Sequence, residues 1–136
     1  MHDNAPAIPK GSGETILVVK DNPDVLEVAT TLLSSLGYRI LTAEDGRAAL
    51  AVLEKSREVE LLFTDVVLPH GMNGVALAQQ AASRHPALKV LYTSGYTDRA
   101  DFGQGVLQDG INLLRKPYAK AVLAQQIRRT LDGSGP

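Results

Sequence analysis

The sequence contains no cysteine, which excludes a disulfide framework and any thiolate chemistry. No apolar run approaches the roughly 20 residues of a membrane-spanning helix, and the N-terminus lacks the basic start and apolar core of a signal peptide. Neither charge sign is in excess, because 14 Lys and Arg face 15 Asp and Glu for a net charge of −1. Nucleic acid and acidic lipid both require a basic surface, so neither is expected as the main partner. A cytoplasmic protein without membrane insertion is the expectation.

A length of 136 residues, of which 44% are hydrophobic, is typical of one domain with one core. Residues 1–13 are punctuated by Pro6, Pro9, Gly11 and Gly13, which predicts a flexible leader or linker. Residues 132–136 have the same character and predict a flexible tail. The folded domain is therefore expected over residues 14–131.

Short apolar runs alternate with helical patterns along residues 14–131, which predicts a parallel sheet covered by helices on both sides. Strands are expected at residues 15–19, 39–43, 61–64, 89–92 and 111–114. The second is the most polar and is expected at a sheet edge. Helices are expected after Asn22, ending at Gly37, and at residues 46–55, 74–85, 98–110 and 119–131. Three glycines weaken the prediction for residues 98–110.

Polar side chains follow the carboxyl ends of four of these strands, where parallel sheets bind their ligands. They are Asp21, Asp65, Thr93 and Lys116. A carboxylate at a strand end is a candidate nucleophile, and phosphoryl transfer needs little more than such an acceptor and charge neutralisation. Two carboxylates, Asp21 and Asp65, together with the backbone carbonyl of Val67, are donors that suit Mg²⁺. A hydroxyl from Thr93 and an ammonium from Lys116 suit phosphoryl oxygens.

The ordered set of motifs resembles the receiver domain of response regulators. It consists of residues 18–22, 64–69, 71–74, 93–96 and 116–118. The resemblance implies a flavodoxin-like, doubly wound (βα)5 three-layer sandwich with strand order 2-1-3-4-5. It implies a phosphorelay function, in which Asp65 takes a phosphoryl group from the phosphohistidine of a sensor histidine kinase or phosphotransfer protein, assisted by Thr93 and Lys116. The receivers of hybrid sensor histidine kinases are the most similar. The implied partner surface, also available to a homodimer, spans residues 98–114 and 119–131.

One position departs from the receiver pattern, because the family carries two adjacent acids after the first strand and this chain has Lys20 before Asp21. The added cation is expected to weaken Mg²⁺ binding through repulsion. We expect the long stem of Lys20 to let its ammonium swing out to solvent. A second possibility is that the ammonium pairs with Asp65 and occupies the place of the metal.

A second departure is Leu113, where receivers commonly place an aromatic switch residue. Tyr92, Tyr96 and Tyr118 are alternative switch residues that the sequence does not rank. Lys20 and Leu113 keep open a pseudo-receiver, which binds partners without phosphorylation. An enzyme with an aspartyl nucleophile is disfavoured, since the position for its general acid is Val67. A flavodoxin-like cofactor binder is disfavoured because no glycine-rich loop follows the first strand.

Overall fold

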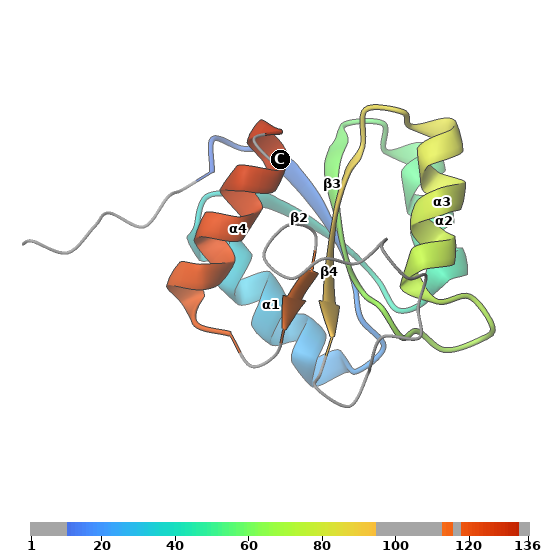
Figure 1. Ribbon diagram of the computed structural model, residues 1–136, viewed down its shortest axis with the longest axis horizontal. Helices are drawn as coiled ribbons and strands as arrows, with labels where there is room; N and C mark the ends of the chain where they lie inside the picture. The colour runs from blue at the N-terminus through green and yellow to red at the C-terminus, as the bar shows by residue number, and fades with distance from the viewer. Residues whose placement is uncertain (1–10, 95–112, 116–117, 134–136) are drawn as a thin grey trace, which may run out of the picture.

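The computed structural model describes residues 11–94, 113–115 and 118–133. The helix expected over residues 98–110 and the side chain of Lys116 lie outside this part of the chain. Within it, strands and helices alternate in the following order (Figure 1): β1 (Thr15–Val19), α1 (Pro23–Ser35), β2 (Arg39–Ala43), α2 (Gly46–Lys55), β3 (Val59–Asp65), α3 (Gly74–Arg84), β4 (Lys89–Ser94), β5 (Leu113–Arg115) and α4 (Lys120–Asp132).

The strands form one parallel sheet in the order β2-β1-β3-β4-β5. This confirms the predicted flavodoxin-like order, with the polar strand β2 at an edge. Two strands are longer than predicted at their carboxyl ends, since β3 reaches Asp65 and β4 reaches Ser94. The extension matters for function because it places Asp65 and Thr93 opposite each other in the β3–β4 register.

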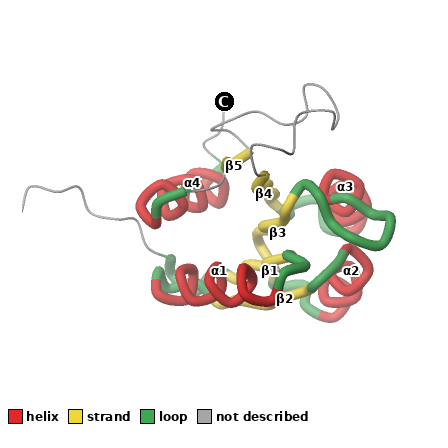
Figure 2. Tube along the Cα trace, turned by 90° about the horizontal axis from the view of Figure 1, so that it is seen from below, coloured by secondary structure: helices red, strands yellow, loops and turns green. Residues whose placement is uncertain are grey.

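Helices cover both faces of the sheet, with α1 and α4 on one face and α2 and α3 on the other (Figure 2). Neighbouring residues of each strand point to opposite faces and divide the core in two. In β1, Leu17 and Val19 belong to the α2–α3 core, whereas Ile16 and Val18 belong to the α1–α4 core. Burial on both faces explains why β1 is apolar at every position after Thr15.

The predicted beginning and end of α1 are confirmed by its caps. The Asn22 side chain accepts hydrogen bonds from the backbone N–H groups of Asp24 and Val25, at 2.9 and 3.2 Å. After the helix, Gly37 has a φ of +96°, a conformation that glycine adopts without strain. The Asn22 cap fixes the direction in which the chain leaves β1, and therefore the place of Lys20 and Asp21.

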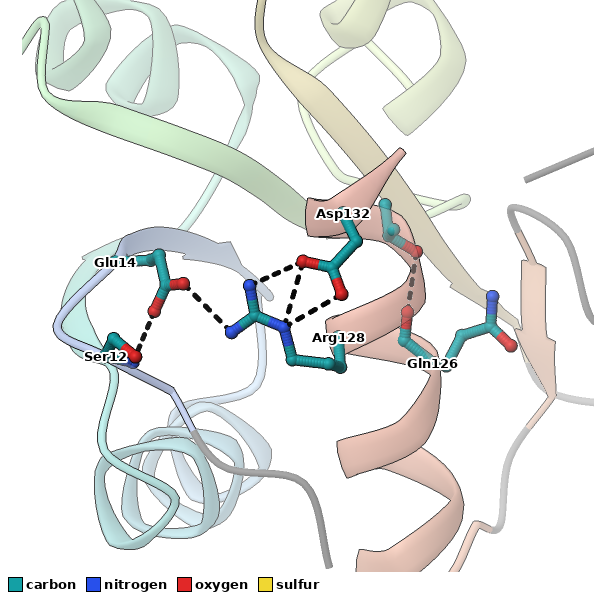
Figure 3. Close-up of polar contacts among 6 residues, drawn as sticks. Ser12, Glu14, Gln126, Arg128 and Asp132 are labelled. Atoms are coloured by element: carbon teal, nitrogen blue, oxygen red, sulfur yellow. Dashed lines mark hydrogen bonds and ion pairs between the residues drawn. The ribbon is translucent and has the colours of Figure 1, made fainter. Parts of the chain in front are cut away.

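The segment before β1 is joined to α4 by one arginine (Figure 3). Arg128 donates to Glu14 at 2.9 Å and to Asp132 at 2.7 Å. The backbone N–H of Ser12 donates to the same Glu14 carboxylate at 2.6 Å. Arg128 thus connects the two ends of the folded domain. Among the described residues, no helix is both long enough and apolar enough to span a membrane.

Candidate functional site

Three polar side chains meet at the carboxyl ends of β1, β3 and β4. The alternation of each strand explains why they meet, since each polar residue lies two positions after a residue of the α1–α4 core. Lys20 follows Val18, Asp65 follows Phe63, and Thr93 follows Leu91. All three therefore emerge on the same face of the sheet, at adjacent strands.

The three side chains form a closed hydrogen-bonded triangle. Lys20 Nζ donates to Asp65 Oδ1 at 2.9 Å and to Thr93 Oγ1 at 3.1 Å. Thr93 Oγ1 donates its one hydrogen to the same Asp65 Oδ1 at 2.6 Å. Because the hydroxyl accepts from the ammonium while donating to the carboxylate, each of the three groups is hydrogen-bonded to the other two. We call these residues the Lys20–Asp65–Thr93 triangle.

The Lys20 side chain is wholly buried, and the Asp65 side chain is 11% exposed. The Lys20 ammonium lies 4.7 Å from the ring centroid of Phe63, within the range of a cation–π contact. The expectation that Lys20 swings out to solvent is therefore wrong. The carboxylate, the hydroxyl and the aromatic face together give the ammonium more favourable contacts than the stem would gain by extending outward. The alternative expectation, a pairing of Lys20 with Asp65, is the arrangement found.

The backbone around Asp65 is held closely by its neighbours. The N–H of Val66 donates to the carbonyl oxygen of Thr93 at 2.9 Å, and the N–H of Gly74 donates to that of Val66 at 2.7 Å. A Cβ at Gly74 would collide with the carbonyl oxygen of Asp65. Glycine at this position therefore lets the first turn of α3 approach the end of β3.

The other predicted site residues are more open or lie outside the described chain. Asp21 is exposed just after β1, and Val67 is 46% exposed two residues beyond Asp65. No hydrogen bond or ion pair between Asp21 and the triangle is found in the described chain. The described part of the chain contains no cluster of three or more His, Cys, Asp or Glu side chains placed to hold a metal ion. The predicted metal donors include only two carboxylates.

Tyr118 also lies near Asp65. The sequence alone did not distinguish it from Tyr92 and Tyr96 as a switch residue. Burial, together with the negative charge of Asp65, raises the pKa of its phenol to about 12. Its side chain packs against the α1–α4 core. The alternation along the strands is a sequence signal that Lys20, Asp65 and Thr93 share one face of the sheet, although it does not give the direction of the Lys20 stem. No comparable signal pointed to Tyr118, which follows β5 in the sequence.

The other switch positions differ in their surroundings. Leu113 is buried in the α2–α3 core, on the face opposite the triangle, and so is Tyr92. Tyr96 lies outside the described residues. Of Tyr92 and Tyr118, the two that the structure describes, Tyr118 is the one for which a charge interaction with Asp65 is found.

The chain belongs to the response regulator receiver domain family, whose sequence profile matches residues 16–128. The chain is 32% identical over 120 residues to the sensor kinase CckA of Brucella abortus, covering 87% of this chain and 12% of the kinase. It is 28% identical to the response regulator receiver protein CpdR of the same organism, over 85% of this chain and 95% of that protein. The solved receiver domain of the hybrid histidine kinase CckA superposes with a TM-score of 0.69 at 29% identity, over 86% of this chain and 98% of that domain.

These relatives confirm the predicted fold and the similarity to receivers of hybrid histidine kinases. Several of them are much longer than this chain. It spans 12% of CckA and 53% of the probable transcriptional regulatory protein TcrX of Mycobacterium tuberculosis. The family defines the chain as a receiver of two-component signalling.

Proposed function

We propose that this receiver accepts a phosphoryl group on Asp65 from the phosphohistidine of a sensor histidine kinase or phosphotransfer protein. The observation that carries the proposal is the Lys20–Asp65–Thr93 triangle, in which a carboxylate at a strand end is held beside a hydroxyl and a cation. Its place at the carboxyl edge of a parallel sheet is where such folds bind ligands. The signalling role follows from family membership, and the residue roles are inferred from this geometry.

In the transfer step, a carboxylate oxygen of Asp65 forms a bond to phosphorus as the bond from phosphorus to the donor imidazole breaks. The electron pair of the broken bond returns to the imidazole nitrogen. The Lys20 ammonium reduces the repulsion between the anionic carboxylate and the incoming anionic group. Rotation of the Thr93 hydroxyl from Asp65 Oδ1 provides a hydrogen bond to a phosphoryl oxygen. We assign the same supporting role to the ammonium of Lys116.

Receivers typically bind Mg²⁺, and the donors proposed here are the carboxylates of Asp21 and Asp65 and the backbone carbonyl of Val67. The oxygen chemistry of this set suits the ion. The buried ammonium of Lys20 opposes binding of the ion, because it is a cation that already pairs with Asp65 Oδ1. The arrangement in this structure therefore does not fit a divalent cation, and we propose that Mg²⁺ binding is weakened.

Several further features belong to this proposal. Residues 14–131 form the receiver, residues 1–13 are a leader or a linker, and residues 132–136 are a tail. The receiver catalyses only its own phosphorylation and dephosphorylation. It acts in the cytoplasm, without nucleic acid or membrane insertion. Its partner surface, also available to a homodimer, comprises residues 98–114 and 119–131.

A pseudo-receiver is the second candidate function. The observation that favours it is again the buried ion pair of Lys20 with Asp65, because a carboxylate already neutralised by the protein is a weaker nucleophile. In that case the domain binds partners through its surface and Asp65 has only a structural role.

Reaction with phosphoramidate, a small donor with a phosphorus–nitrogen bond, distinguishes the two functions. Intact-mass spectrometry of the wild-type chain, with and without Mg²⁺, is expected to show one added phosphoryl group. The Asp65→Asn variant is expected to show none. Absence of the adduct from the wild-type chain under both conditions would contradict the proposed function and favour the pseudo-receiver.

A further inference from the structure

Resting on the proposed function of Asp65, we propose that Lys20 is the built-in counter-cation of the site. Its ammonium takes the place that a divalent metal would hold beside Asp65. The site of this chain is therefore assembled around a protein cation and does not bind Mg²⁺ at millimolar concentrations.

The hydrogen bonds at Asp65 Oδ1 are the first support. A carboxylate oxygen has two lone pairs in its plane. At Oδ1 one faces the ammonium of Lys20 at 2.9 Å and the other the hydroxyl of Thr93 at 2.6 Å. A metal ion can bond to this oxygen only by displacing one of the two donors. Displacing Thr93 leaves the cation of Lys20 in place, and displacing Lys20 removes a buried charge from its partner.

Charge repulsion is the second support. An ion bonded to Asp65 Oδ1 would lie within about 5 Å of the Lys20 nitrogen, because a Mg–O bond is about 2.1 Å long. Repulsion at that separation is strong in a site with little water. The Asp65 side chain is only 11% exposed, so solvent screens this repulsion poorly.

The anchoring of Lys20 is the third support. Its backbone N–H donates to the carbonyl oxygen of Ala43 at 3.2 Å, which fixes the start of the side chain beside β2. Its ammonium lies over the Phe63 ring, and its whole side chain is buried. To bind, a metal ion would have to displace from the core an ammonium that is shielded from water and makes two hydrogen bonds. An ordinary surface lysine, by contrast, moves aside at little cost.

The test is a Mg²⁺ titration of the unphosphorylated full chain, followed by the amide NMR signals of residues 20–22 and 65–67 and by calorimetry. Four chains are compared, namely wild type, Lys20→Asp, Lys20→Met and Lys55→Asp. Lys20→Asp supplies a carboxylate where the cation stood. Lys20→Met removes the cation without adding a ligand. Lys55→Asp changes the net charge equally on the exposed end of α2 and is the matched control.

We expect no saturable binding by wild type or Lys55→Asp at millimolar Mg²⁺. Lys20→Asp is expected to bind at least about a hundredfold more tightly, because a nearby charge changes sign. Lys20→Met is expected to fall between them, and it decides the question if Lys20→Asp does not fold. Saturable binding by wild type with the affinity of the folded Lys20 variant would overturn the proposal.

This titration is independent of phosphorylation. A wild-type chain that fails to react with phosphoramidate but also ignores Mg²⁺ refutes the phosphoacceptor function and leaves Lys20 as the counter-cation. Conversely, a wild-type chain that reacts at Asp65 and binds Mg²⁺ as tightly as Lys20→Asp supports the phosphoacceptor function and refutes the role of Lys20 as counter-cation.

Discussion

Two clusters in this domain each join a basic side chain to carboxylates, one in the first cluster and two in the second, and they differ in burial. At the carboxyl edge of the sheet, Lys20 is fully buried and holds a nearly buried Asp65. At the other end of β1, Arg128 is 26% exposed and joins Glu14, which is 15% exposed, to Asp132, which is 51% exposed (Figure 3). The Lys20–Asp65 pair is therefore shielded from water, whereas the Arg128 cluster is partly hydrated.

The difference in burial supports our proposal that the Arg128 cluster has a structural role and the Lys20–Asp65 pair a functional one. Arg128 satisfies two carboxylates with its planar fork and remains hydrated, so the cluster joins the chain ends without a large desolvation cost. Removing Lys20 and Asp65 from water costs much of what their attraction returns, so a buried pair is an inefficient source of stability. The buried pair lies where ligands bind in such sheets, which favours a role for Lys20 in neutralising the charge of Asp65.

The largest expected effect is the coupling energy of the buried pair. A double-mutant cycle of Lys20→Met and Asp65→Asn, measured by urea unfolding, is expected to give about 3 kcal/mol of favourable coupling. Asp65→Asn alone is expected to destabilise the domain, since it leaves a buried ammonium without its carboxylate. A site surrounded only by acids would instead gain stability when one acid is neutralised. A gain in stability for Asp65→Asn would therefore contradict the pairing.

A substitution that displaces the backbone of Asp65 tests how closely the buried cluster depends on its position. Gly74→Ala places a Cβ against the carbonyl oxygen of Asp65 and is expected to cost about 2 kcal/mol of unfolding free energy and to slow phosphorylation. The matched control is Gly46→Ala, also at the first residue of a helix, where the new Cβ meets the flexible side chain of Met72. Equal losses in the two variants would show that the approach of α3 to Asp65 is unimportant.

Titration of Tyr118 reports the charge of Asp65. Because the pKa of its phenol is raised to about 12 from an ordinary value of 10.0, the folded state retains the proton more strongly than the unfolded state. Stability is thus complete below pH 10 and falls as the pH rises to about 12, by roughly 2 kcal/mol. Burial causes most of the shift, and Asp65→Asn is expected to lower the pKa by removing the remainder. NMR of labelled tyrosine checks this, and an unchanged pKa would place Tyr118 away from the charge of Asp65.

The smallest effect is expected at the Arg128 cluster, which is the more hydrated of the two. Burial opposes ionisation of Glu14, but hydrogen bonds from Ser12 and Arg128 outweigh it and hold its pKa below the ordinary 4.5. Its stabilisation is therefore present above pH 4.5 and is lost as the pH falls through the lowered pKa. Glu14→Gln is expected to cost less than about 1 kcal/mol at neutral pH and to match wild type in acid.

Thermal unfolding across this pH range measures the difference, with Glu54→Gln as the control, because Glu54 pairs with Arg84 at an exposed site. A loss of stability in Glu14→Gln as large as the coupling energy of Lys20 with Asp65 would remove the distinction between the clusters.

Most of the fold could be predicted from the sequence because its signals are local. The continuous apolar run of β1, the Asn22 cap and Gly37 each depend on neighbouring residues, and each is confirmed. The polar edge strand β2 followed from composition in the same way. The strand ends were less predictable, since β3 and β4 continue into polar residues that pair across the sheet.

The candidate site was predicted in part. Asp65 and Thr93 were identified from their positions after apolar runs, and the structure brings them together. The burial of Lys20 depends on Phe63, Asp65 and Thr93, which lie 43 or more residues away along the chain. A lysine stem permits either a buried or an extended conformation, so no local pattern decides between them. Lys116 stays a sequence prediction, because it lies outside the described residues.

The central claim is that Asp65 accepts a phosphoryl group while Lys20, rather than a metal ion, neutralises it. The direct measurement is the rate of adduct formation at Asp65 with phosphoramidate, in excess EDTA and in excess Mg²⁺. We predict the same rate in both conditions for wild type, and a rate that requires Mg²⁺ for Lys20→Asp. A wild-type chain that reacts only with Mg²⁺, or that does not react at all, would contradict the claim.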